Sequence, residues 1–184
     1  MLAGVRGPPQ AVAPLAGRAV FRNLSLDFGF QAEEDHGVPP ITHTVEIARP
    51  ADEVFAYLDD LERHGEWQSQ IVSSRRDTEG PTRVGTRATD VRRVPGRTQS
   101  ITYEVTEHDP PRKVSFKGVN GPVRPVGTVT VEPAGEGASK VTIELDLQGH
   151  GLLGQLIAPL ARNQARKQVP EDQARLKERL ESGV

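Results

Sequence analysis

The chain has 184 residues, a net charge of −2 and no cysteine. This length fits one domain with some residues left over, and the charge gives no overall basic field that would attract nucleic acid. The absence of cysteine excludes disulfides, thiolate metal sites and cysteine nucleophiles, and it fits a cytoplasmic location. No apolar run reaches the roughly 18 residues that a membrane span needs, so we expect no integral membrane association.

The first forty residues differ from the rest in composition. The segment MLAGVRGPPQAVAPLAG is rich in Ala, Gly and Pro and has no period. It is followed by a Phe-bearing stretch and by the acidic, Pro-ended segment QAEEDHGVPP. We predict that residues 1–40 form a disordered or loosely docked N-terminal extension. The alternative is an arm whose Phe21, Phe28 and Phe30 pack on a partner.

From Ile41 onward the patterns of regular structure are clear. ITHTVEI alternates apolar and polar residues, as a half-buried strand does. Pro50, Asp52 and Glu53 then indicate a helix start, because proline fixes φ and carboxylates favour the positive end of the helix dipole. Two short helices are expected over residues 51–66, running into Trp67. Six further strand-like segments follow, separated by turn residues, as in an antiparallel meander.

A long helix is predicted over residues 151–180. Pro159 and Pro170 remove backbone donors, so we expect a kink near 155–159 and a second kink or break near 169. The part before Pro159 would be a movable apolar lid, and the part after Pro170 an anchor on the sheet. The apolar positions are expected to share one face; they are Leu152, Leu153, Leu156, Ile157, Leu160, Val169, Leu176 and Leu180.

The middle of this helix, residues 161–168, offers only alanines as apolar side chains. Either it spans a cavity, where Asn163 and Gln164 reach polar ligand atoms, or it overhangs the sheet edge. The order of elements as a whole predicts an α+β fold. In it, a curved antiparallel sheet of about seven strands surrounds the C-terminal helix and leaves a cavity between them.

Several segments, in this order and spacing, resemble one known family. They are ITHTVEIARPADEVFAYLDDLERHGEWQ, GTRATDV, ITYEVTEHDPPRKVSF, GTVTVEP and VTIELDL. Residues 41–180 resemble the polyketide cyclase/dehydrase group of the START-like (SRPBCC) superfamily. The resemblance implies a helix-grip domain over residues 41–184, with a cavity between sheet and C-terminal helix that holds an apolar small molecule. Residues 1–40 depart from it, because typical members begin almost at the first strand.

Three side chains are candidates for specific contacts with such a ligand. Trp67, the single tryptophan, is either a core residue or a wall of the cavity mouth that stacks on a ring. Tyr103 faces inward by strand alternation, and its hydroxyl could bind a ligand carbonyl or move a proton. Arg87 would be a counter-charge for a ligand carboxylate or enolate if it points inward. The strand phase leaves open whether Arg87, Thr89 and Val91 face inward or outward.

The remaining candidate ligand contacts are apolar wall residues and helix positions: Phe116, Val129, Ile143, Leu156, Leu160 and Gln164. No metal is expected, because the histidines lack the HxH, HxxxH and HExxH spacings. No GxSxG, P-loop or GxGxxG is present, so neither hydrolase-triad nor nucleotide chemistry is indicated, and no cofactor is expected. An isolated histidine such as His64 is expected to be structural.

Three functional hypotheses follow. The first is binding of a hydrophobic or aromatic small molecule, lipid-like or polyketide-like, by a monomer or homodimer. The second is a polyketide cyclase or dehydratase, with polar cavity residues such as Tyr103 and Arg87 stabilising an enolate; no catalytic residue is assigned. The third is a protein-interaction module that uses the Arg-rich strands or the Phe-bearing arm.

Overall fold

The computed structural model describes residues 38–183. The predicted arm residues Phe21, Phe28 and Phe30 lie outside this range. The strands of the described part are β1 (Ile41–Ile47), β2 (Ile71–Arg76), β3 (Arg87–Val94), β4 (Arg97–Asp109), β5 (Lys113–Gly118), β6 (Val123–Pro133) and β7 (Ser139–Gly149). Its helices are α1 (Ala51–Asp59), the 3-10 turn η1 (Leu61–Arg63), α2 (His64–Trp67) and α3 (Gly151–Ser182).

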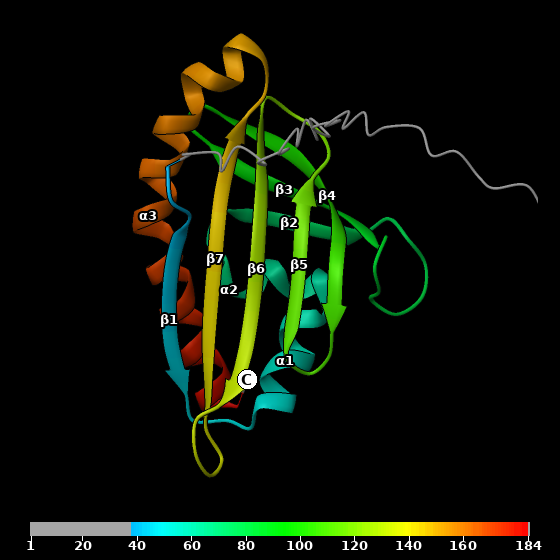
Figure 1. Ribbon diagram of the computed structural model, residues 1–184, viewed down its shortest axis with the longest axis vertical. Helices are drawn as coiled ribbons and strands as arrows, with labels where there is room; N and C mark the ends of the chain where they lie inside the picture. The colour runs from blue at the N-terminus through cyan, green and yellow to red at the C-terminus, as the bar shows by residue number, and fades with distance from the viewer. Residues whose placement is uncertain (1–37, 184) are drawn as a thin grey trace, which may run out of the picture. The chain divides into compact units, whose positions relative to one another are not determined.

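The strands of residues 38–183 form one antiparallel sheet of seven, in the order β1-β7-β6-β5-β4-β3-β2. The first strand pairs with the last, with Ile41 opposite Leu145 and Ile47 opposite Ser139. The sheet curls, and α3 lies along β1 and β7 (Figure 1). We call the face that carries the helices the inner face. This arrangement confirms the predicted helix-grip fold.

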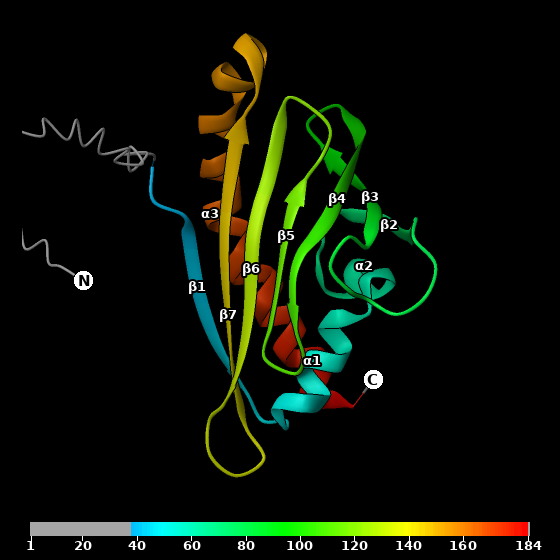
Figure 2. The same ribbon diagram turned by 45° about the vertical axis from the view of Figure 1, so that its right-hand side comes forward.

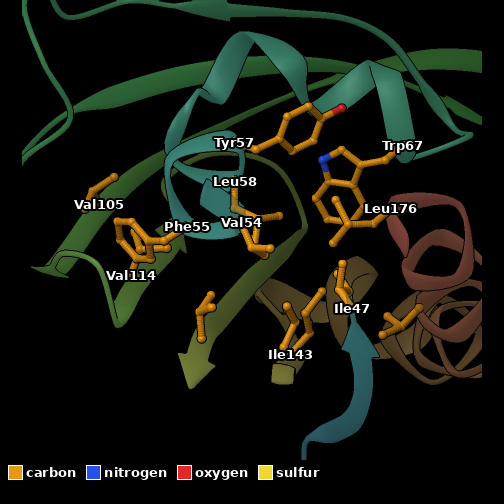
Figure 3. Packing of buried hydrophobic residues seen from close by; sticks show 13 residues of the cluster. Ile47, Val54, Phe55, Tyr57, Leu58, Trp67, Val105, Val114, Ile143 and Leu176 are labelled. Atoms are coloured by element: carbon orange, nitrogen blue, oxygen red, sulfur yellow. The ribbon is translucent and has the colours of Figure 1, made fainter. Parts of the chain in front are cut away.

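The main hydrophobic core lies where α1, α2 and the C-terminal half of α3 meet the sheet (Figure 3). The side chains of Ile47, Val54, Val131, Val141 and Leu176 are all 0% exposed. Burying one aliphatic side chain of this size stabilises the fold by about 1.5–3 kcal/mol. This end of the molecule therefore carries most of the packing energy.

The long helix is not broken, so of the kink or break predicted near residue 169 the break is wrong. α3 is helical without interruption from Gly151 to Ser182, with both prolines inside it. The helix is curved rather than straight in both views (Figures 1 and 2), as expected where proline removes a helix hydrogen bond. Around Pro170 the neighbouring side chains of Val169, Asp172 and Gln173 are buried. Their packing holds the two segments in one helix.

The prediction that the leucines of α3 share one inward face is also wrong. Leu176 is fully buried, whereas Leu152, Leu153, Leu156 and Leu160 are 89%, 62%, 78% and 69% exposed. Apart from the half-buried Ile157, the apolar residues turned toward the sheet in the N-terminal half are small: Gly154 and Ala158 are buried, and Ala161 and Ala165 are half-buried. A Cβ at Gly154 would lie 2.0 Å from the Pro122 carbonyl oxygen. This close approach sets the rotation of the helix and turns the leucines outward.

Candidate ligand-binding site

Tyr103 lies on the inner face of β4, where the alternation predicted it, and is 5% exposed. Its cross-strand neighbours are Ala88 on β3 and Gly118 on β5. Residues directly opposite on adjacent strands project to the same face. The two small neighbours therefore leave room between them for the phenol ring.

His64, at the start of α2, meets Tyr103 from the opposite side. The tyrosine hydroxyl is 3.2 Å from His64 Nδ1, and the two rings stack with centroids 6.0 Å apart. Asp90 Oδ2 lies 3.7 Å from the same nitrogen, and Asp90 Oδ1 accepts a hydrogen bond of 2.8 Å from Ser74 Oγ. Asp90 is buried and His64 is nearly so. A buried phenol, imidazole and carboxylate thus converge on the inner face.

The environment of Tyr103 fixes its protonation state. Burial, followed by the negative charge of Asp90, raises the pKa of the Tyr103 hydroxyl far above its ordinary value, although Arg92 and Arg76 oppose this. The hydroxyl therefore keeps its proton at neutral pH. It can donate a hydrogen bond to a carbonyl or hydroxyl oxygen, but it does not serve as a base.

The arginine of β3 that lies on the inner face is Arg92 and not Arg87. Arg87 faces outward and pairs with Glu104 at 2.8 Å, with its side chain 56% exposed. The inner face of β3 carries Ala88, Asp90 and Arg92, and Arg92 Nη2 donates to Gln68 Oε1. Arg87 is thus removed from the inner face by the phase of its strand. We call Tyr103, His64, Asp90, Ser74 and Arg92 the polar cluster.

An apolar wall adjoins the polar cluster. Phe116 is half-buried against Tyr103, with ring centroids 5.6 Å apart. Its ring lies over Gly127, where a Cβ would be 2.6 Å from Phe116 Cζ. Val129 and Ile143 are register partners on β6 and β7. The structure therefore brings the predicted wall residues together on one face with Tyr103.

Trp67 belongs to the main core, where its ring is 5% exposed (Figure 3). It meets His64 edge to face, with centroids 6.1 Å apart and an interplanar angle of 81°. Its Nε1 is buried without a hydrogen-bond partner among residues 38–183. Trp67 thus packs between helix and sheet and reaches the polar cluster only through His64.

The three candidates on α3 lie away from this face. Leu156 is exposed to water, while Leu160 and Gln164 border an open pocket of about 280 Å³ between α3 and the turn before β2. A second pocket of about 340 Å³ lies between α3 and β1. Neither pocket is lined by Tyr103 or the apolar wall. An internal cavity between sheet and helix stays a prediction.

Sequence reasoning did not select His64, Asp90 or Arg92 as site residues. The alternation of β3 put Asp90 and Arg92 on the same face as Ala88, but both faces of this strand mix polar and apolar side chains. The pairing of Ala88 with Tyr103 decides the phase. Within residues 38–183, no group of three or more His, Asp or Glu side chains could hold a metal ion, and no helix there could span a membrane.

Solved structures with the same fold support the architecture. TTHA0849 from Thermus thermophilus is 22% identical, with a TM-score of 0.66 over 79% of this chain and 99% of that one. A START superfamily protein from Mycobacterium smegmatis is 14% identical, with a TM-score of 0.66 over 80% of this chain and 100% of that one. The Zhui aromatase/cyclase from a Streptomyces species is 18% identical, with a TM-score of 0.59 over 74% and 87% of the two chains.

Identities this low establish the fold alone. A comparison with curated protein sequences finds no match. The family model described as "Polyketide cyclase / dehydrase and lipid transport" matches residues 39–181, which include every strand and nearly all of α3. The chain therefore belongs to the polyketide cyclase/dehydrase and lipid transport family, with the START-like helix-grip fold that its sequence predicted.

Proposed function

We propose that this protein binds a hydrophobic or aromatic small molecule that carries a carbonyl or hydroxyl group. The ligand lies between the inner face of the sheet and the N-terminal half of α3. The observation that carries the proposal is the position of Tyr103, a permanently protonated donor at the border between the apolar wall and the polar cluster. A ligand site of this kind combines apolar walls with a few well-placed polar groups.

The N-terminal half of α3 supports the proposal, because it presents small side chains to the sheet. Besides Ile157, it turns Gly154, Ala158, Ala161 and Ala165 toward the sheet, and on the inner face Phe116, Val129 and Leu145 are only half-buried. A ligand ring that enters here covers apolar surface that the helix leaves partly open. Movement of this half of the helix then makes the space in which the ligand sits.

Replacing the Tyr103 hydroxyl with hydrogen tests the proposed site. The sequence has two tyrosines, and the Tyr57 hydroxyl donates a hydrogen bond to Glu66, outside the polar cluster. Tyr57→Phe is therefore the matched control for Tyr103→Phe. Native mass spectrometry of the protein from its own host should show a bound small molecule, and Tyr103→Phe should reduce its occupancy. Titration calorimetry with 1,8-dihydroxyanthraquinone should show binding weakened up to about tenfold by Tyr103→Phe, the loss of one hydrogen bond.

Two outcomes contradict the proposal. One is a protein that carries no bound mass from its host and gives no heat with the anthraquinone. The other is an equal loss in both tyrosine variants, which would point to a general effect on folding.

A cyclase or dehydratase is the second candidate, and the position of His64 favours it. An imidazole between a phenol and a carboxylate can take a proton from the carbon next to a ligand carbonyl, while Tyr103 hydrogen-bonds the enolate oxygen. His64→Asn should then abolish turnover of a poly-keto substrate and leave its binding within about threefold of wild type. Turnover that persists in His64→Asn rules out this role.

A further inference from the structure

The outer face of α3 carries an apolar stripe with no partner among the described residues. Leu152, Leu153, Leu156 and Leu160 are each at least 62% exposed. At about 100° per residue they fall within one arc of roughly 100°. Large side chains scattered singly on a surface need no explanation, but a contiguous apolar stripe marks an interaction site.

The same end of the molecule lacks negative charge. The segments 91–103, 118–131 and 147–170 contain no Asp or Glu, although the whole chain has a net charge of −2. Asp146, just before the third segment, is paired with Arg162 at 2.6 Å. Cationic side chains from three parts of the chain lie in these segments, namely Arg93, Arg97, Arg124, Arg166 and Lys167.

Contacts hold these segments together in space. The His150 amide donates to the Pro122 carbonyl at 2.7 Å, which ties the start of α3 to the β5–β6 loop. The Val119 amide donates to the Thr102 carbonyl at 2.8 Å, which ties the same loop to β4. In both views the first turns of α3 extend beyond the ends of β6 and β7 (Figures 1 and 2). We call this tip the leucine end.

We infer that the leucine end docks on an anionic phospholipid surface, with its leucines in the boundary between headgroups and acyl chains and its Arg and Lys side chains at the lipid phosphates. Residues 151–170 of α3 combine an apolar face with flanking cations and contain no Asp or Glu, which is the composition of an interfacial helix; the acidic residues of α3 begin at Glu171. Each such cation adds attraction to an anionic bilayer. The projecting tip reaches a flat surface without obstruction from the sheet.

Two other occupants of the leucine end, a second copy of the chain and a nucleic acid, fit it less well. A second copy docked through the same end would bring two ends of like positive charge together, which repel each other. A nucleic acid would match the cations but would leave the four leucines in water. The inference goes beyond the proposed function and does not rest on it.

Vesicle co-sedimentation of the full-length protein tests the inference. We expect binding to vesicles of equal parts phosphatidylcholine and phosphatidylglycerol, and much weaker binding to phosphatidylcholine alone. The double variant Leu153→Ser/Leu156→Ser should weaken binding by at least about tenfold, because two leucines no longer leave water. Its matched control is Val72→Ser/Val84→Ser, which changes side chains that are 48% and 61% exposed elsewhere on the surface.

The charge component has its own pair of variants. Lys167→Glu should weaken binding by more than about fivefold, since each cation near an anionic surface contributes roughly that factor. Lys140→Glu makes the same change on the exposed side of β7 near its hairpin with β6, and should have little effect. Melting curves establish that each variant folds.

Several results overturn the inference. They are no sedimentation of the wild type, equal binding to both kinds of vesicle, or undiminished binding of the leucine variant. A dimer that Leu153→Ser/Leu156→Ser dissociates would assign the stripe to a second copy. Binding to a single-stranded DNA oligonucleotide that depends on Lys167 alone would assign the cations to nucleic acid. Anthraquinone binding measured on the same variants separates this test from that of the proposed function.

Discussion

The two halves of α3 belong to the same helix but are held in different ways. The C-terminal half buries Val169 and Leu176 in the main core. It is also tied by polar contacts, among them Arg179 to Glu66 at 2.7 Å and Lys177 to the Glu46 carbonyl at 2.7 Å. The N-terminal half buries Gly154 and Ala158 and exposes its leucines. The apolar content of a helix segment therefore does not tell how firmly it is attached.

The difference assigns a role to each half. The N-terminal half is attached by small side chains, the half-buried Ile157 and one ion pair, Arg162 to Asp146, so less apolar surface is lost when it separates from the sheet. The C-terminal half is attached through a fully buried leucine, one ion pair to another element and several hydrogen bonds, and stays in place. The contrast separates a firmly anchored base from a more loosely attached segment, which under the proposed function would move over the ligand.

The difference in attachment between the two halves is tested most directly by making the same substitution, Leu to Ala, in each of them. Leu176→Ala should lower the free energy of unfolding by about 2–5 kcal/mol, as for other fully buried leucines. Leu156→Ala, in which the lost side chain is 78% exposed, should change it by less than about 0.5 kcal/mol. Urea denaturation followed by circular dichroism measures both. Similar values for the two variants would mean that the halves are equally anchored.

A smaller effect is expected from adding a methyl group at Gly154, where α3 and the β5–β6 loop approach closely. Gly154→Ala forces a Cβ against the Pro122 carbonyl, 2.0 Å away in the present geometry, and should cost about 1–3 kcal/mol through strain. Hydrogen exchange should become faster in residues 151–165 and stay unchanged in 169–180. Gln155→Ala, at an exposed neighbour, is the control. Faster exchange throughout the helix would contradict the division into halves.

The smallest effect concerns the pH dependence of the anchor. Asp172 Oδ1 accepts a hydrogen bond of 3.1 Å from the Ser69 amide. Burial raises the pKa of the Asp172 carboxyl, although the hydrogen bonds from Ser69 oppose this. Because the folded pKa lies above the unfolded one, the native state holds the proton more tightly, and the stability contributed by this group falls as pH rises through the folded pKa.

Asp172→Asn removes this titration. The melting temperature of the variant relative to wild type should therefore rise from about pH 4 to neutrality, by no more than about 2–4 °C. Glu171→Gln, at the exposed neighbouring position, should show no such trend. If the melting temperature of Asp172→Asn relative to wild type stays constant or falls as pH rises, the hydrogen bonds to the Asp172 carboxylate fully offset the cost of its burial.

The sequence was sufficient to predict the order of elements, because strand alternation and turn residues are local signals. β1, with its ITHTVEI pattern, and β4, with inward Tyr103, were placed from alternation alone. The rotation of α3 was not predictable in this way. Leucines were assumed to face the core, whereas a non-local contact between Gly154 and Pro122 turns them outward.

The same limit applies to the candidate site: local pattern predicted which strand residues face inward, but not which polar side chains meet there. The inward placement of Tyr103, Phe116, Val129 and Ile143 followed from their strands. Arg92 in place of Arg87 required the register between β3 and β4, which joins distant residues. His64 required knowledge of where α2 lies over the sheet. Local pattern thus places wall residues, and tertiary pairing decides which polar side chains join them.

The edge-to-face contact of Trp67 with His64 gives this molecule an optical reporter of its own. As the sequence holds a single tryptophan, all indole emission comes from a ring whose centroid is 6.1 Å from that of His64. A change in the distance or angle between these two rings changes the surroundings of the indole and hence its emission. Fluorescence of the unlabelled protein therefore reports any movement of His64 relative to Trp67, next to the polar cluster.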